Sequence, residues 1–171
     1  LADPAGDVRA TALGALQRMG RLEADDVEKA LRDPDPVVRR RACEVSAPVP
    51  LGRLVGALGD PEQLVVDGAC FALGERGENS DGATDAVSAL SRVAVSHKDP
   101  LCREAAIAAL GAIGDPAGLS AILHGIDDKP AVRRRAVIAL SPFDGPEVDE
   151  ALERARSDRD WQVRQAAEDL S

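Results

Sequence analysis

Aromatic side chains are nearly absent from this sequence of 171 residues, which has no Tyr, two Phe and one Trp. Hydrophobic residues still make up 44% of the chain, so the core must consist of small aliphatic side chains. A core of Ala, Leu and Val favours helices that approach closely, whereas sheets would use β-branched and aromatic residues more heavily. The composition therefore predicts an all-α protein.

Basic side chains are also in short supply, with 21 Lys and Arg against 30 Asp and Glu and a net charge of −9. A negative protein repels phosphate backbones at long range and attracts basic partners. We therefore expect nucleic acid to be an unlikely partner. We expect instead a protein segment with some basic character.

The chain has no apolar run of about 18 residues and no charged-then-apolar leader. From these two absences we expect no membrane partner and a cytoplasmic location. Arg outnumbers Lys by 18 to 3. We interpret this excess as the habit of a GC-rich bacterial genome.

One short pattern recurs six times along the chain. Its anchor is Arg in five copies and Val in one, an apolar residue precedes the anchor, and Ala follows it after three residues. The residues one before and three, four and seven after the anchor are mostly aliphatic. At about 100° per residue, these four positions share one helical face. The pattern predicts six copies of one amphipathic helix. The anchors are Arg9, Arg39, Val66, Arg103, Arg133 and Arg164.

Second helices are predicted between these copies, with apolar stripes over 51–58 and 119–126 and weaker ones over 27–31 and 148–155. Each repeat is therefore a helical hairpin. Aspartates precede several anchor helices at the N-cap position, and prolines occupy the first helical position. These capping residues are Asp35, Asp99 and Asp160, and Pro36, Pro100 and Pro130.

The segments 33–43 (DPDPVVRRRAC), 65–77 (VVDGACFALGERG) and 99–115 (DPLCREAAIAALGAIGD) resemble HEAT-like repeats of the short bacterial type also found in phycobilin lyases. The resemblance covers nearly the whole chain and implies a right-handed α-α superhelix of about 11 helices. It implies a single array over 1–171: a lone inner helix at about 5–19, then five outer–inner hairpins. A polar insertion at about 75–84 interrupts the array. The anchor-bearing helices would line the concave surface.

In the resembling family, Asp and Arg side chains form a hydrogen-bonded ladder between adjacent repeats. The resemblance implies a structural ladder of this kind here. Its expected members are Arg39, Arg133, Arg164, Asp33, Asp60, Asp127 and Asp158.

Positions one, two and five residues after each anchor point away from the apolar stripe and form the predicted partner-binding surface. The arginines among them are expected to face solvent, and a solvated face is favoured over a binding role. The apolar members Phe71 and Ile138 fit equally a packing contact or an anchor for a partner peptide. The predicted surface comprises Arg40, Arg41, Glu44, Asp67, Phe71, Glu104, Arg134, Arg135 and Ile138.

Residues suited to catalysis or metal binding are scarce. The three cysteines stand at repeat positions where most other copies have an apolar residue, so we expect them in the core. They are Cys43, Cys70 and Cys102. Neither His97 nor His124 has a His or Cys at metal-ligand spacing. We therefore predict no catalytic residue, no metal site and no cofactor.

Three functions remain open. The favoured one is a non-catalytic interaction or scaffold module that binds a partner through the concave surface. The first alternative is a DNA-binding protein of the alkylpurine DNA glycosylase type, which the net charge and the missing Tyr disfavour. The second is a bilin lyase-like tetrapyrrole-handling protein, for which no aromatic-lined cleft is visible. HEAT-like hydroxylases hold di-iron through His-Glu pairs, but Lys98 and Gly125 follow the two histidines here.

Overall fold

The computed structural model of the protein describes residues 1–77 and 82–170. These residues form eleven α-helices and two short 3₁₀ helices, and no strand is present among them. Residues 78–81, in the middle of the predicted insertion, lie outside the described residues. The helices are α1 (Gly6–Arg18), α2 (Ala24–Ala30), α3 (Pro36–Glu44), α4 (Leu51–Ala57), α5 (Gln63–Arg76), α6 (Ala83–Ser96), α7 (Pro100–Ile113), η1 (Pro116–Gly118), α8 (Leu119–His124), η2 (Gly125–Asp127), α9 (Pro130–Ala139), α10 (Pro146–Arg156) and α11 (Trp161–Glu168).

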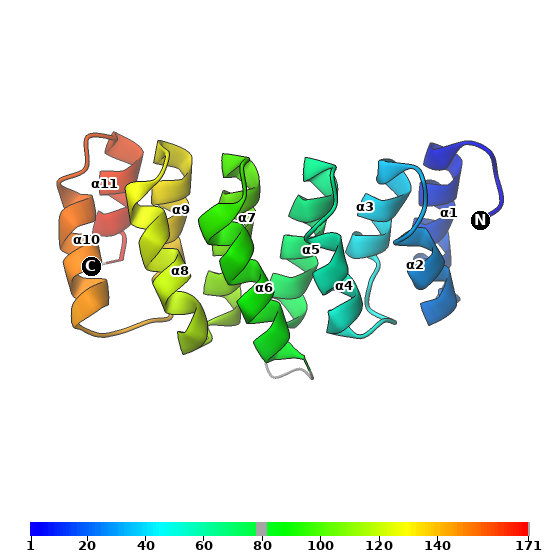
Figure 1. Ribbon diagram of the computed structural model, residues 1–171, viewed down its shortest axis with the longest axis horizontal. Coiled ribbons are helices and arrows are strands. Elements are labelled where there is room, and N and C mark those ends of the chain that lie inside the picture. The colour runs from blue at the N-terminus through cyan, green and yellow to red at the C-terminus, as the bar shows by residue number, and fades with distance from the viewer. Residues whose placement is uncertain (78–81, 171) are drawn as a thin grey trace.

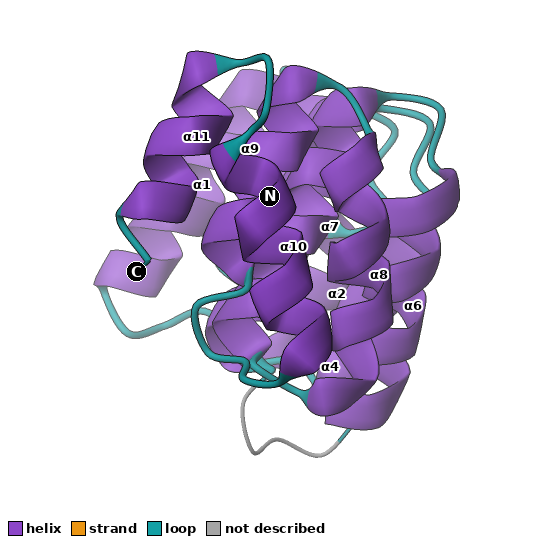
Figure 2. Cartoon of the chain, turned by 90° about the vertical axis from the view of Figure 1, so that its left-hand side faces the viewer, coloured by secondary structure: helices purple, strands orange, loops and turns teal. Residues whose placement is uncertain are grey.

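The helices form a linear two-layer array, with the N-terminus at one end and the C-terminal helices at the other (Figure 1). The view along the array separates α1, α9 and α11 from α4, α6 and α8 (Figure 2). We call α1, α3, α5, α7, α9 and α11 the inner layer, because these are the anchor-bearing helices, and α2, α4, α6, α8 and α10 the outer layer. Successive inner helices contact one another more extensively than successive outer helices do. The fold is thus an all-α solenoid in which the inner helices pack together more closely than the outer helices do.

The helix starts follow the chemistry of the sequence. Asp35, Asp99 and Asp160 each accept a hydrogen bond at 2.9 Å from the backbone N–H two residues later. Pro36 and Pro100 then occupy the first helical position, where a missing N–H has no cost. Gly114 ends α7 with a φ of 68°, a left-handed conformation that glycine adopts without strain.

The core lies between the layers and is built from the repeated small residues. The alanines three residues after the anchors in α3, α5, α7 and α9 are completely buried. The inner helices approach so closely that a Cβ added to Gly111 would lie 2.7 Å from the Cβ of Ala139. A Cβ added to Gly74 would lie 3.0 Å from the Cα of Ala109. Small side chains therefore set the spacing between successive repeats.

The segment 45–50 replaces the last turns of α3, because Pro48 and Pro50 cannot continue a helix. Arg76, from the end of α5, secures this segment by donating to the backbone carbonyls of Ser46 at 2.8 Å and Val49 at 2.7 Å. Burial lowers the pKa of this guanidinium. The irregular segment is therefore held by a side chain from the next repeat.

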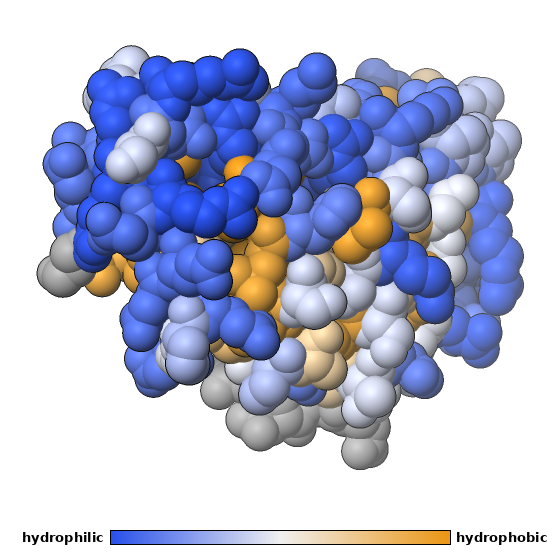
Figure 3. Space-filling model, turned by 60° about the vertical axis from the view of Figure 1, so that its left-hand side comes forward, coloured by the Kyte–Doolittle hydropathy of each residue, from blue (hydrophilic) through white to orange (hydrophobic). Residues whose placement is uncertain are grey.

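Within the described ranges 1–77 and 82–170, no helix has the length and apolar character needed to cross a membrane. The face seen in Figure 3, with the C-terminal end turned forward, is mostly hydrophilic, and its hydrophobic residues show as patches between polar ones.

Candidate functional site

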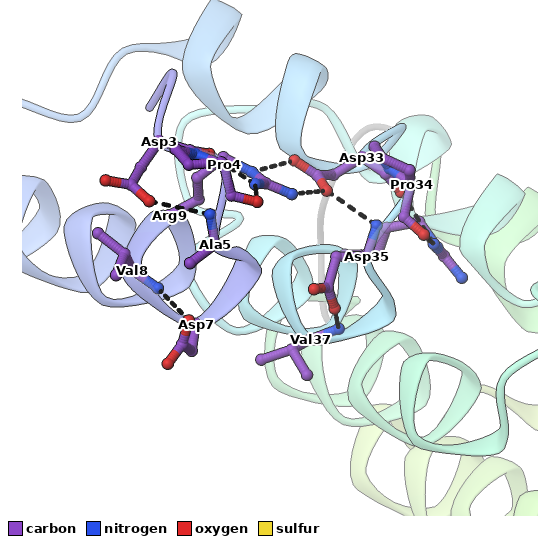
Figure 4. A network of polar contacts seen from close by, with 11 residues as sticks. Asp3, Pro4, Ala5, Asp7, Val8, Arg9, Asp33, Pro34, Asp35 and Val37 are labelled. Atoms are coloured by element: carbon purple, nitrogen blue, oxygen red, sulfur yellow. Dashed lines mark hydrogen bonds and ion pairs between the residues drawn. The ribbon is translucent and has the colours of Figure 1, made fainter.

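Within the described residues, arginine–aspartate pairs join four of the five seams between inner-layer repeats. In each pair the guanidinium makes two hydrogen bonds to one carboxylate of the following repeat, as for Arg39 Nε and Nη2 with Asp60 at 2.7 and 2.9 Å. The remaining nitrogen, Nη1, donates to a backbone carbonyl of the turn before its own helix. Figure 4 shows this arrangement for Arg9. The pairs are Arg9–Asp33, Arg39–Asp60, Arg103–Asp128 and Arg133–Asp158.

The paired carboxylates are stabilised in their charged form. Hydrogen bonding from the arginine lowers the pKa of Asp33, Asp60, Asp128 and Asp158 below the ordinary value. Backbone N–H groups also donate to these carboxylates, for example that of Asp160 to Asp158 at 2.7 Å. Both partners are largely shielded from solvent, so the pairs fasten one repeat to the next and leave little charge for a ligand.

The structure differs from the predicted ladder at three points. Asp128, not Asp127, accepts from Arg103, because η2 keeps Asp127 helical and turns it outward to Arg154. Arg9 and Arg103 also belong to the ladder. Their partner aspartates lie before the next inner helix along the chain, and not in the turn before the helix that carries the arginine. Arg164 donates to the backbone carbonyl of Asp158, and the described residues contain no further hairpin beyond α11.

The seam between α5 and α7 has no arginine–aspartate pair among the described residues, because Val66 stands at the anchor position of α5. On the inner layer this seam carries a groove of about 490 Å³. The groove follows the two helices for most of their length. It is lined by Gln63, Leu64, Asp67, Phe71, Gly74, Glu75, Leu101, Glu104, Ala105, Ala108, Ala109, Ala112 and Arg135.

Three large apolar side chains of the groove are exposed to solvent. Phe71 is 64% exposed, Leu64 58% and Leu101 55%. Small residues of α7 line the groove between them, where Ala105, Ala108 and Ala112 leave room. Exposed apolar side chains gathered along one groove make it the candidate interaction surface of the described residues.

Carboxylates flank the apolar part of the groove. Asp67 and Glu75 lie four residues before and four residues after Phe71, so all three side chains fall on one face of α5. Glu104 of α7 is paired with Arg135 of α9, with Oε1 and Nε 3.5 Å apart. No ion pair joins Asp67 or Glu75 to another residue of the described parts of the chain. These two acids give the groove a net negative charge.

The groove brings together only four of the nine residues of the predicted binding surface: Asp67, Phe71, Glu104 and Arg135. Arg40 and Arg41 lie on α3 and pair with Glu44 at 3.2 and 2.6 Å. Ile138 is exposed on α9, outside the groove.

Two arginines are less exposed than predicted. Arg134 and Arg135 are half-buried, because α9 packs between α7 and α11. Neither Nε atom has a hydrogen bond within the described residues, and that of Arg135 meets Glu104 only as an ion pair at 3.5 Å. Sequence reasoning also missed Leu64, Leu101 and Glu75. The signal available for the two leucines was an apolar residue two positions before the anchor, which recurs at Val37, Leu64 and Leu101.

All three cysteines are free thiols with no exposed surface. Burial raises the pKa of Cys43 to about 12 and that of Cys102 to about 11, and it raises the pKa of Cys70 as well. Within the described residues, no group of three His, Cys, Asp or Glu side chains is arranged to hold a metal ion.

We expect the cysteines to be unreactive in the folded protein. A thiol-specific disulfide reagent at about pH 8 should modify none of them in the native state, because attack requires an accessible thiolate. In denaturant the same reagent should titrate all three. A native thiol that reacts at the rate of a free cysteine would contradict this placement.

Comparisons with known proteins agree with the architecture. Residues 51–131 match the family model of HEAT repeats. A designed armadillo repeat protein in complex with the peptide (KR)4 is similar, with a TM-score of 0.68 and 20% identity, covering 92% of this chain and 83% of that chain. An engineered protein has a TM-score of 0.65 and 20% identity, with coverages of 96% and 85%. Human deoxyhypusine hydroxylase has a TM-score of 0.57 and 19% identity, with coverages of 99% and 80%. No curated protein matches the sequence. At these identities the structural similarities describe the fold.

Proposed function

Because this chain is a HEAT-like repeat protein, we propose that it is a non-catalytic module that binds a segment of a partner protein on its inner layer, in the groove between α5 and α7. The observation that carries the proposal is the cluster of Phe71, Leu64 and Leu101, three exposed apolar side chains that line one groove. Burying them against a partner would remove apolar surface from water, which is the main driving force of association.

Two further observations support a protein as the partner. The similar designed armadillo repeat protein binds a peptide of alternating Lys and Arg. In this chain the unpaired acids of the groove are Asp67 and Glu75, which favour a segment with basic character. The inner-layer arginines Arg40, Arg41 and Arg135 face glutamates within ion-pair distance, so they give no continuous positive strip for nucleic acid.

Selection from a random peptide library displayed on phage tests this proposal. Peptides recovered on the wild-type protein should bind Phe71→Ser about tenfold more weakly or worse, since a central aromatic side chain dominates such interfaces. Trp161→Ser is the matched control, because Trp161 is also 64% exposed but lies on α11, at the end of the array. Its binding should be unchanged. If no peptide is enriched, or if the selected peptides bind Phe71→Ser as well as the wild type, the proposal is wrong.

A further inference from the structure

The length of the groove sets how many residues of an extended occupant it can contact. Its lining on α5 runs from Gln63 to Glu75, a distance of about 18 Å at 1.5 Å per residue. An extended chain advances about 3.3 Å per residue, so about five residues of such a chain span that length.

The charged and apolar side chains of α5 repeat at a spacing that an extended chain matches. Asp67, Phe71 and Glu75 follow one another at intervals of four residues, so their Cα atoms are about 6 Å apart along the helix. Alternate residues of an extended chain point to the same side at intervals of about 6.6 Å. Three alternate side chains of one short segment therefore lie opposite the acid, the phenyl ring and the second acid.

Charge complementarity then fixes the chemistry of the occupant. The carboxylates of Asp67 and Glu75 are both exposed, and neither has a basic partner among the described residues. Between them Phe71 is exposed and lines the groove together with small alanines of α7, which leaves room for an aliphatic side chain. We propose that the groove binds an extended protein segment of the form cation–x–aliphatic–x–cation, lying along α5, with Lys or Arg at each end. This inference rests on the proposed function and specifies its ligand.

A short fluorescent peptide containing Lys-Ser-Leu-Ser-Lys tests the proposal by fluorescence anisotropy. Changing Leu to Ser, or both Lys to Glu, should abolish its binding to the wild-type protein. A peptide with three spacer residues on each side of Leu, which matches a helical occupant, should bind several-fold more weakly. Tighter binding of that peptide would show a helical occupant and overturn the proposal.

Variants of the protein test whether the peptide binds at Asp67 and Glu75. Asp67→Asn and Glu75→Gln should each weaken binding by about threefold, the effect of one exposed ion pair. The double variant should weaken it by about tenfold and make the affinity less sensitive to salt. Glu150→Gln is the matched control, because Glu150 is an exposed acid on the outer helix α10. It should bind as the wild type does.

The outcomes separate this proposal from the general one. If library-selected peptides depend on Phe71 but neither they nor the test peptide depend on Asp67 and Glu75, the binding module stands and the assigned motif is wrong. If no peptide of any kind depends on Phe71, both proposals are wrong. If sedimentation shows self-association that Phe71→Ser abolishes, the groove is occupied by a second copy of the chain and the segment proposal is overturned.

Discussion

The variant Gly111→Ala is expected to lower the free energy of unfolding by about 2 kcal/mol, although it adds one methyl group. The new Cβ would lie 2.7 Å from the Cβ and 2.8 Å from the Cα of Ala139, so α7 and α9 must separate. The higher helix propensity of alanine offsets only about 1 kcal/mol of this strain. Chemical denaturation followed by circular dichroism measures the loss.

The same substitution at Gly56 is the matched control. Gly56 lies in α4, and a Cβ added there meets no atom within 4 Å. Gly56→Ala should therefore stabilise the protein by about 0.5 kcal/mol, through propensity and the lower entropy of the unfolded chain. If both variants change stability in the same direction, the close approach of α7 and α9 does not set the spacing of the repeats.

Arg133→Met should destabilise the fold by about 3 kcal/mol, because it breaks a shielded ion pair and leaves a carboxylate without its partner. Arg133 is 5% exposed and donates to Asp158 at 2.9 and 2.7 Å and to the carbonyl of Asp128 at 2.9 Å. Arg154→Met is the control in the same part of the array, since Arg154 and its partner Asp127 are both exposed. Its effect should stay within about 0.5 kcal/mol.

The cost of Arg133→Met should depend on pH in a defined direction. Arg133 lowers the pKa of Asp158 in the folded protein, whereas the unfolded chain has an ordinary value of about 3.9. The pair therefore stabilises the fold fully above that value, and its contribution is lost as the pH falls through the lower folded pKa. The difference in unfolding free energy between wild type and variant should be largest above about pH 5 and should shrink in stronger acid. A difference that stays constant, or grows, in acid would exclude the pair as its source.

The arginine–aspartate ladder illustrates how far the repeat pattern reaches. The repeat pattern places an arginine at the anchor position of every inner helix except α5, and Arg39 and Arg133 do make paired contacts with aspartates. The pattern does not identify which carboxylate each arginine meets. That choice depends on where η2 ends, and the end of η2 puts Asp128 in the position expected for Asp127.

The repeat pattern predicts less of the groove than of the ladder. Phe71 and Asp67 were expected on the exposed side of one helix, but Leu101 and Glu104 line the same groove only because α7 packs beside α5. Arg135 was expected in solvent and instead extends back toward Glu104 of the preceding repeat. Each of these placements depends on contacts between repeats.

The sequence by itself determined the repeated anchor-bearing helices and the small aliphatic core. These features follow from a helical period and from local capping, both of which act within a few neighbouring residues. Only the tertiary structure decided which side chains of different repeats meet in the ladder and in the groove. Those contacts depend on the distance and rotation between adjacent helices. Both quantities result from packing across the seams at Gly74 and Gly111.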